Sequence, residues 1–174
     1  MKYEEAKEIL NANDKISYPK LQNIYKNKNL ANMLYDDYAG KLGELTAITQ
    51  YTYEHISLNS NVDISNIMLL IAKQEMKHLD IIGNLINLLG LQPYYMDSKL
   101  HPWDSKNIKY DIGDIKEMME YNIYTERMAI EGYQKIIMRT RSINIQRILS
   151  RIILDEKSHI EIFRKIISNN IKSL

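Results

Sequence analysis

Residues 71–82 read Ile-Ala-Lys-Gln-Glu-Met-Lys-His-Leu-Asp-Ile-Ile and contain a Glu-x-x-His pair, Glu75 and His78, inside an apolar pattern. A second pair, Glu156 and His159, lies in a similarly apolar stretch near the end of the sequence. On a helix, side chains three positions apart share one face. The chain has four histidines, so half of them follow a glutamate at this spacing. The two pairs therefore predict helices that carry a carboxylate and an imidazole on their apolar faces.

Apolar residues recur with helical spacing around both pairs and in two further stretches. We expect four long helices, over residues 30–58, 64–89, about 111–140 and 143–169. Asp63 is an expected N-cap, Gly90 an expected C-terminal stop, and Asp111 or Asp114 the expected cap of the third helix. Residues 91–110 are long enough to cross a bundle from one end to the other.

These elements predict an all-α protein with a single domain over residues 1–174. Residues 29–170 would form a four-helix bundle of two antiparallel hairpins joined by the long crossover. Residues 1–28 would form an N-terminal extension with a short helix over residues 1–11, wrapped around the bundle.

The composition argues against several classes of protein. The net charge is +1 with no block of basic residues, so we expect neither nucleic acid nor a membrane surface as partner. There is no cysteine, which excludes disulfides and cysteine-bound zinc or iron–sulfur centres. We see no signal peptide and no apolar run of the ~18 residues that a membrane span needs. We therefore expect a cytoplasmic protein.

An internal repeat links the two halves of the chain. Residues 44–51 read Glu-Leu-Thr-Ala-Ile-Thr-Gln-Tyr, and residues 126–133 read Glu-Arg-Met-Ala-Ile-Glu-Gly-Tyr. Each segment precedes a Glu-x-x-His pair by nearly the same distance. Each half would thus be a hairpin with one glutamate on its first helix and one pair on its second, all near the helix midpoints.

Six side chains would then converge in one layer of the core, and their burial indicates a metal site. Ionised carboxylates buried without partners cost several kcal/mol each, and four together repel one another. Two divalent cations would balance four carboxylates, and an oxygen-rich ligand set favours Fe or Mn over Zn. The predicted ligands, which are also the candidate catalytic residues, are Glu44, Glu75, His78, Glu126, Glu156 and His159.

At these residues the chain resembles the ferritin-like di-metal carboxylate superfamily, and it looks closest to the rubrerythrin-like and manganese-catalase-like branches. The resemblance covers about residues 30–170 and implies a ferritin-like bundle with two Fe or Mn ions per chain. It implies that Glu75 and Glu156 bridge the metals, that Glu44 and Glu126 are terminal, and that each histidine binds one metal. It also implies that Asp155 orients His78 and that Gln74 orients His159.

The chain departs from these relatives in three respects. Rubrerythrins usually carry a further glutamate where this chain has Ile123, and they usually have a cysteine-rich rubredoxin domain. Bacterioferritins bind haem through a methionine placed like Met76, but the ligand spacing here is shorter. Manganese catalases are longer, with more elaborate connections.

Other residues have a plain structural interpretation beside a functional one. Tyr51 and Tyr133 are expected to pack in the core, with a hydrogen bond to a ligand or a redox role as the functional alternatives. We expect His55 to be an ordinary interior or rim histidine, and His101 and Trp103 to anchor the crossover.

Three functions fit the predicted site. The first is a rubrerythrin-like oxidoreductase that acts on peroxide or O₂ with an unknown electron donor, or a manganese-catalase-like enzyme that disproportionates peroxide. The second is ferritin-like iron oxidation and storage, and the third is a structural protein that keeps metal for stability. We also expect a homodimer or a larger homo-oligomer.

Overall fold

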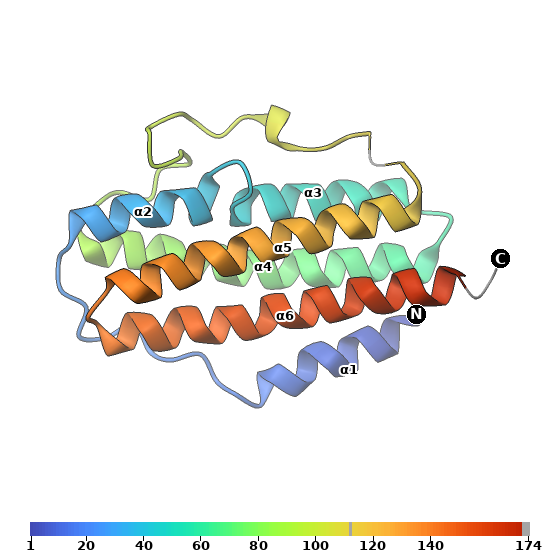
Figure 1. Cartoon of the computed structure of the whole chain (residues 1–174), viewed down its shortest axis with the longest axis horizontal. Helices are drawn as coiled ribbons and strands as arrows, with labels where there is room; N and C mark the ends of the chain where they lie inside the picture. Colours follow the sequence, from blue (N-terminus) through green and yellow to red (C-terminus); the bar gives the residue numbers. More distant parts are fainter. Residues whose placement is uncertain (112, 172–174) are drawn as a thin grey trace.

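The computed structural model describes residues 1–111 and 113–171, which form a helical bundle (Figure 1). Its elements are α1 (Tyr3–Asp14), α2 (Lys28–Ala39), α3 (Glu44–Ser57), α4 (Val62–Leu89), the short 3₁₀ helix η1 (Ser105–Asn107), α5 (Ile115–Arg139) and α6 (Ile143–Ile171). These described ranges hold no β-strand, and Met96 and Pro102 form an isolated antiparallel bridge. None of their helices combines the length and apolar character that a membrane span requires. The all-α prediction is confirmed.

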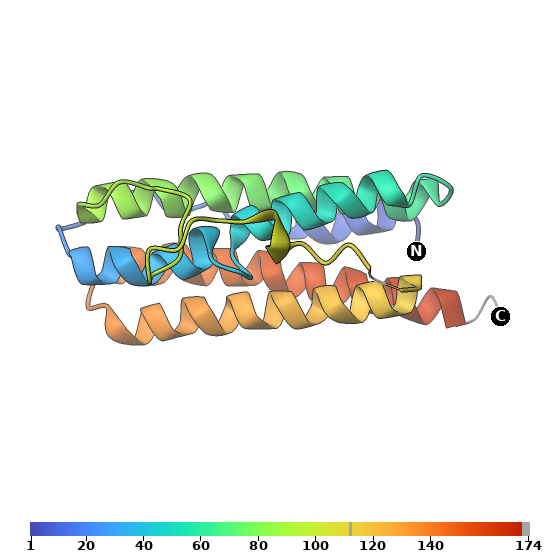
Figure 2. The ribbon, with the colours of Figure 1, turned by 90° about the horizontal axis from the view of Figure 1, so that it is seen from above.

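The helices pair as two antiparallel hairpins, α3 with α4 and α5 with α6 (Figures 1 and 2). α2 precedes α3 along the same side of the bundle and packs against α4 and α5. The crossover that follows α4 runs along the outside of α2 and α3 and returns the chain to the start of α5 (Figure 1). Trp103 fixes this crossover, because its indole N–H donates to the Thr46 hydroxyl at 2.9 Å.

Two apolar clusters fill the interior on either side of a polar layer. On α4, one cluster ends at Ala72 and the other begins at Ile82. On α6, the clusters are separated in the same way, between Ile153 and Ile160. The predicted ligands lie in the gap between the clusters on each of these helices. Apolar packing on both sides therefore fixes the level of the polar layer and shields it from water.

The first long helix was predicted to be continuous over residues 30–58, and this is wrong. The chain leaves the helix after Ala39 and begins a new one at Glu44. A side chain at Gly40 would have its Cβ 2.5 Å from the Asp36 carbonyl oxygen, and one at Gly43 would have it 2.6 Å from that of Asp37. Such close approaches admit only glycine. The break makes Glu44 the first residue of α3, where free backbone N–H groups favour a carboxylate.

Several helix ends differ slightly from the predicted ones. α4 is capped by Asn61, whose side chain accepts a bond from the Ile64 N–H, and not by Asp63. Asp63 instead binds the N-terminal extension, accepting from Lys2 Nζ at 3.0 Å and from the Tyr3 N–H at 3.1 Å. The predicted stop at Gly90 is present, with a φ of +100° that glycine adopts without strain.

Helix α1 extends to Asp14, beyond the predicted end at residue 11, and packs against α4 and α6. Its buried residues Ala6 and Leu10 join the apolar cluster that lies nearer the chain termini. The segment after α1 then runs alongside α6 toward the start of α2 (Figure 1), and hydrogen bonds join Asn13 to Leu154 and Arg151 to Ile16, next to the polar layer.

Candidate metal centre

All six predicted ligands come together in the polar layer. Glu44 lies at the start of α3 and Glu126 in the middle of α5, while α4 and α6 each contribute one Glu-x-x-His pair. Every one of the six is buried, with at most 3% of its surface exposed. They form two groups that share two members, and in each group the ligand atoms lie within 4.8 Å of one another.

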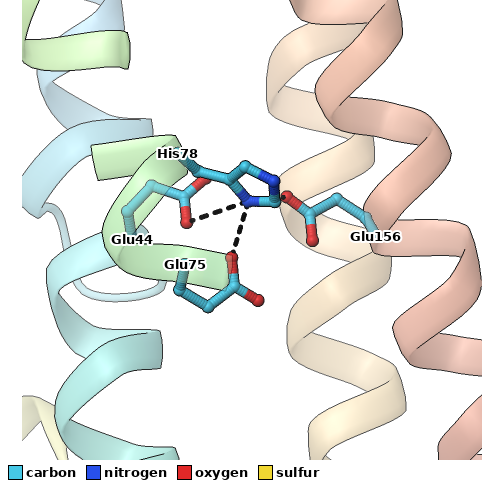
Figure 3. A group of neighbouring side chains, drawn as sticks. All are labelled: Glu44, Glu75, His78 and Glu156. Carbon is cyan, nitrogen blue, oxygen red and sulfur yellow. Dashed lines mark hydrogen bonds and ion pairs between the residues drawn. The ribbon is translucent and has the colours of Figure 1, made fainter. Parts of the chain in front are cut away.

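The first group surrounds His78 (Figure 3). The Nδ1 atom of His78 lies 2.7 Å from Glu75 Oε2, 3.1 Å from Glu156 Oε1 and 3.8 Å from Glu44 Oε2. These four side chains come from three different helices, and their oxygen atoms point toward the same ring nitrogen. One imidazole nitrogen and three carboxylate oxygens are a suitable ligand set for one Fe or Mn ion.

The second group surrounds His159 in the same way. The Nδ1 atom of His159 lies 3.0 Å from Glu75 Oε1, 3.0 Å from Glu156 Oε2 and 3.5 Å from Glu126 Oε1. Glu75 and Glu156 thus appear in both groups, each with a different oxygen in each. A carboxylate that offers one oxygen to each of two positions is able to bridge two ions.

Several atoms that face one another here lack the hydrogen bonds that buried polar atoms normally make. They are Glu75 Oε1, both carboxylate oxygens of Glu156, and His159 Nδ1. All four point into the space shared by the two groups. Metal ions would satisfy these atoms together, so the donor set and its unpaired atoms fit a two-metal centre.

The pKa values of the predicted ligands show that their buried carboxylates repel one another when no metal ion is bound. Burial raises the pKa of Glu44 well above its usual range, and the charges on Glu75 and Glu156 raise it further. Burial and the same two carboxylates raise the pKa of Glu126 to about 8. Burial would lower the pKa of both ligand imidazoles, but the facing carboxylates outweigh it and raise each pKa well above its usual value. Protons therefore neutralise the cluster when cations do not, and binding divalent ions must release them.

The outer nitrogen of each imidazole faces a hydrogen-bond acceptor. His78 Nε2 lies 3.3 Å from Asp155 Oδ2 and 3.0 Å from the Tyr18 hydroxyl. His159 Nε2 lies 3.2 Å from Gln74 Oε1. When the imidazole loses a proton to bind a metal, an N–H kept on Nε2 leaves the Nδ1 lone pair for the ion, which is the tautomer that a ligand requires. The contacts that the resemblance implied for Asp155 and Gln74 are both present.

Two buried tyrosines hold the terminal carboxylates. The Tyr51 hydroxyl donates to Glu126 and the Tyr133 hydroxyl donates to Glu44. The repeat relates the two tyrosines, and each reaches the glutamate of the other hairpin. Core packing and a hydrogen bond to a ligand both apply to these residues, since each ring packs in an apolar cluster while its hydroxyl contacts a predicted ligand.

The remaining candidates lie outside the cluster. His55 bonds to the Ser65 carbonyl oxygen at 2.8 Å, and His101 pairs with Asp97 on the crossover. Met76 is 49% exposed, so its side chain lies outside the buried cluster. Tyr18 was missed, because it lies in a segment without periodicity, 60 positions before the histidine that it contacts.

Residues 39–167 match the model of the rubrerythrin family. The match covers more than half of the 174 residues and includes both groups of candidate ligands. The chain belongs to the rubrerythrin family. The matched region spans the helical bundle from the end of α2 to α6.

This rubrerythrin-family chain is also similar to catalases and bacterioferritins. It is 23% identical over 169 residues to a probable manganese catalase of Clostridium acetobutylicum, and the match covers 85% of this chain and 74% of that protein. KatB, a manganese catalase from Anabaena, has a TM-score of 0.80 at 23% identity, over 88% of this chain and 77% of KatB. The diiron bacterioferritin of Desulfovibrio desulfuricans has a TM-score of 0.69 at 26% identity, over 84% and 81% of the two chains. The ferritin-like bundle is thereby confirmed.

Proposed function

We propose that this chain binds two iron or manganese ions in its core and uses them to remove peroxide or O₂. One observation carries the proposal. Glu75 and Glu156 each place one carboxylate oxygen near His78 Nδ1 and the other near His159 Nδ1. In this assignment the two glutamates bridge, while Glu44 and Glu126 bind one metal each. Two ions would neutralise four carboxylates and leave both imidazoles uncharged.

The chain's own residues would do three things for such a centre. The Tyr51 and Tyr133 hydroxyls hold the terminal carboxylates in place, so that the ligand geometry exists before any ion arrives. The acceptors at both Nε2 atoms fix the imidazole tautomer. The two apolar clusters exclude bulk water from the layer between them. Bound ions would supply the electrons that break the O–O bond of the substrate.

Two reactions on peroxide suit the proposal and differ in their need for electrons. Disproportionation converts two molecules of hydrogen peroxide into two of water and one of O₂, with no external donor. Reduction of one peroxide to water takes two electrons and two protons from a separate donor. Similarity to proteins described as manganese catalases supports the first reaction, and membership of the rubrerythrin family supports the second.

Metal analysis combined with peroxide assays tests the proposal. The purified chain is reconstituted anaerobically with Fe²⁺ or with Mn²⁺, and the metal per chain is measured after removal of free ions. We expect two ions per chain, O₂ release from peroxide in the manganese form, and peroxide consumption with an added reductant in the iron form. Fewer than one ion per chain with either metal would rule out the dinuclear centre.

A pair of histidine variants provides the matched control. His159→Ala removes a proposed ligand, so metal loading and peroxide turnover should fall together. His101→Ala alters a histidine that lies exposed on the crossover, so both properties should stay at the wild-type level. Full metal loading in His159→Ala would show that the ligand assignment is wrong.

A further inference from the structure

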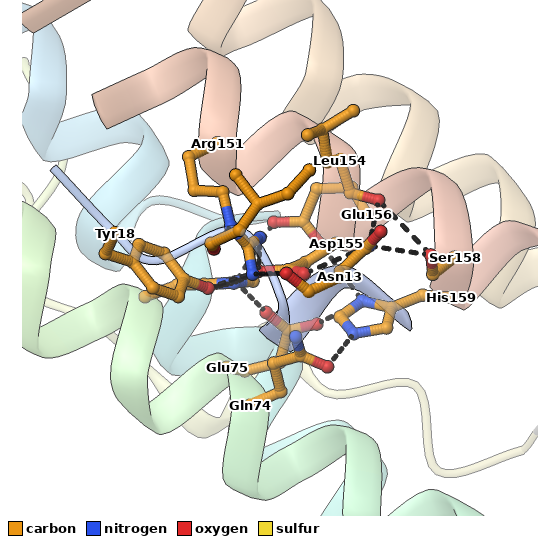
Figure 4. A network of polar contacts seen from close by, with 12 residues as sticks. Asn13, Tyr18, Gln74, Glu75, Arg151, Leu154, Asp155, Glu156, Ser158 and His159 are labelled. Carbon is orange, nitrogen blue, oxygen red and sulfur yellow. Dashed lines mark hydrogen bonds and ion pairs between the residues drawn. The ribbon is translucent and has the colours of Figure 1, made fainter. Parts of the chain in front are cut away.

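The segment after α1 reaches the predicted metal centre from outside the bundle. We call residues 13–18, which comprise the end of α1 and the four residues after it, the N-terminal strap. The strap lies alongside α6, and at its end Tyr18 lies beside Arg151 and Asp155 of that helix (Figure 4). The half-buried Tyr18 ring faces His78. The ring centroids of these two residues lie 6.3 Å apart. A side chain far from the ligands in sequence thus enters the space directly behind one of them.

The Tyr18 hydroxyl joins the ligand to its buried acceptor. His78 Nε2 lies 3.0 Å from the hydroxyl oxygen, and the hydroxyl in turn donates to Asp155. The hydroxyl therefore accepts from the imidazole N–H and passes a hydrogen bond on to the carboxylate. This arrangement holds the ring of His78 so that its other nitrogen, Nδ1, faces Glu75 and Glu156.

A buried arginine fastens the strap to the same carboxylate. Arg151, 3% exposed, pairs with Asp155 at 2.6 Å and donates to the carbonyl oxygens of Ile16 at 2.6 Å and Asn13 at 2.9 Å. The Asn13 side-chain amide donates back to α6, to the Leu154 carbonyl oxygen at 2.9 Å. Backbone and side chain of the strap are therefore both tied to the turn of α6 that carries Asp155 (Figure 4).

Two cations hold the Tyr18 ring between α4 and α6. Lys77 Nζ lies 4.2 Å from the ring centroid and Arg151 Cζ lies 4.3 Å from it. Both distances are within the range of cation–π attraction. Lys77 precedes His78 in α4, so the ring links the helix of the ligand to the helix of its acceptor.

We propose that the N-terminal strap is a latch for one of the two metal positions, with Tyr18 as its positioning residue. The inference rests on the proposed function, because it assumes that His78 binds a metal ion. The other imidazole, His159, is oriented by Gln74, which belongs to the bundle itself. Docking of the strap and metal binding at the His78 position therefore strengthen each other, while the His159 position is independent of the strap.

The reciprocity follows from linkage. If the docked strap raises the affinity of one position for a metal by some factor, the bound metal favours the docked strap by the same factor. Removing an outer partner of a ligating histidine typically lowers metal affinity about 10- to 100-fold. We expect an effect of this size at one position when the Tyr18 hydroxyl is removed.

A manganese titration of Tyr18→Phe measures this effect. Free Mn²⁺ gives a strong electron paramagnetic resonance signal that disappears on binding, so the two sites are counted and their affinities obtained directly. We expect wild type to bind two ions, and Tyr18→Phe to bind one as tightly as wild type and the other about 10- to 100-fold more weakly. Tyr25→Phe is the matched control, because Tyr25 lies in the same part of the chain and is 84% exposed. Circular dichroism of the metal-free proteins checks that the helices are intact.

Limited proteolysis of the wild-type chain tests the latch without any substitution. Trypsin is expected to cut after the exposed Lys15 and Lys20 more slowly in the manganese-loaded protein than in the metal-free one. The exposed Lys106 in the crossover serves as the internal reference, whose cleavage rate should not change. This measurement decides the question even if Tyr18→Phe does not fold.

The outcomes separate the latch from the proposed function. A wild-type chain that binds no manganese or iron contradicts the proposed function. A wild-type chain that binds two ions, together with unchanged affinities in Tyr18→Phe, contradicts only the latch. Equal weakening of both positions, or strap cleavage that is insensitive to Mn²⁺, also overturns it.

Discussion

Glu75 and Glu156 come from opposite hairpins, and each gives one carboxylate oxygen to the His78 group and the other to the His159 group. The four distances from these oxygens to the two Nδ1 atoms lie between 2.7 and 3.1 Å. Glu44 and Glu126, in contrast, each join a single group. The chain thus contains two kinds of glutamate, shared and unshared, and they should respond differently to substitution.

Replacing a shared glutamate should affect both metal positions, and replacing an unshared one should affect only its own. We expect Glu75→Gln to lower metal content from two ions per chain toward none, and Glu126→Gln to lower it to about one. An outer partner of a ligand is worth about 10- to 100-fold in affinity, so loss of a direct ligand should exceed that. Metal analysis after anaerobic reconstitution checks both variants, and two retained ions in Glu75→Gln would contradict the bridging role.

Metal binding should stabilise the fold, because the ions satisfy buried atoms that have no hydrogen-bond partner in the chain alone. A ligand that binds only the native state adds about 4 kcal/mol when its free concentration is 1,000 times Kd. Thermal unfolding with and without Mn²⁺ should show a higher midpoint in the loaded protein, and a chelator should reverse it. Identical midpoints would contradict a metal site in the core.

Removing the hydroxyl of either buried tyrosine should lower the stability of the fold, and each substitution should weaken metal binding at a different one of the two positions. Tyr133→Phe removes the donor to Glu44, and Tyr51→Phe removes the donor to Glu126. An unsatisfied buried acceptor costs about 1–3 kcal/mol, so both variants should unfold at lower urea concentration in the metal-free form. With Mn²⁺, Tyr133→Phe should weaken the His78 position, and Tyr51→Phe the His159 position. Tyr124→Phe, at a half-exposed ring, should match wild type in both measurements.

The ligand set could be predicted from the sequence because the ligands lie in short motifs that occur once in each half of the chain. A Glu-x-x-His pair on an apolar helical face is visible in four residues, and the repeat supplied Glu44 and Glu126. The structure brings together all six residues, although Glu44 lies at the start of α3 and not at a helix midpoint as expected.

Other features could not be predicted, because they depend on where distant segments meet. The spacing of apolar residues continues through Gly40 and Gly43, so periodicity alone extended one helix across the break. Only the closeness of the preceding carbonyl oxygens shows why the chain turns there. Tyr18 and Arg151 are 133 positions apart, and nothing near either residue in sequence indicates that they clamp the same carboxylate.

A buried carboxylate outside the metal centre makes stability depend on pH. Glu54 on α3 is fully buried and accepts hydrogen bonds from Gln50 at 2.9 Å and from Asn122 at 2.7 Å. Burial raises its pKa to about 7, although the two hydrogen bonds act in the opposite direction. The native state therefore keeps a proton that the unfolded chain, in which the pKa of a glutamate is near its ordinary value of 4.5, releases.

The sign of the effect follows from this difference. The stabilising contribution of the protonated carboxyl is complete below pH 4.5 and is lost as the pH rises toward 7. The side chain in Glu54→Gln cannot ionise. The free energy of unfolding of this variant, relative to that of wild type, should therefore be about 2 kcal/mol higher at pH 8 than at pH 5. Urea unfolding of the metal-free proteins at both pH values measures this gain, and the titration of the metal ligands cancels because both proteins share it. Glu131→Gln, at an exposed position of α5, should show the same pH dependence of the free energy of unfolding as wild type. If Glu54→Gln also showed the pH dependence of wild type, Glu54 would have to be ionised in the native state at pH 5 as it is in the unfolded chain.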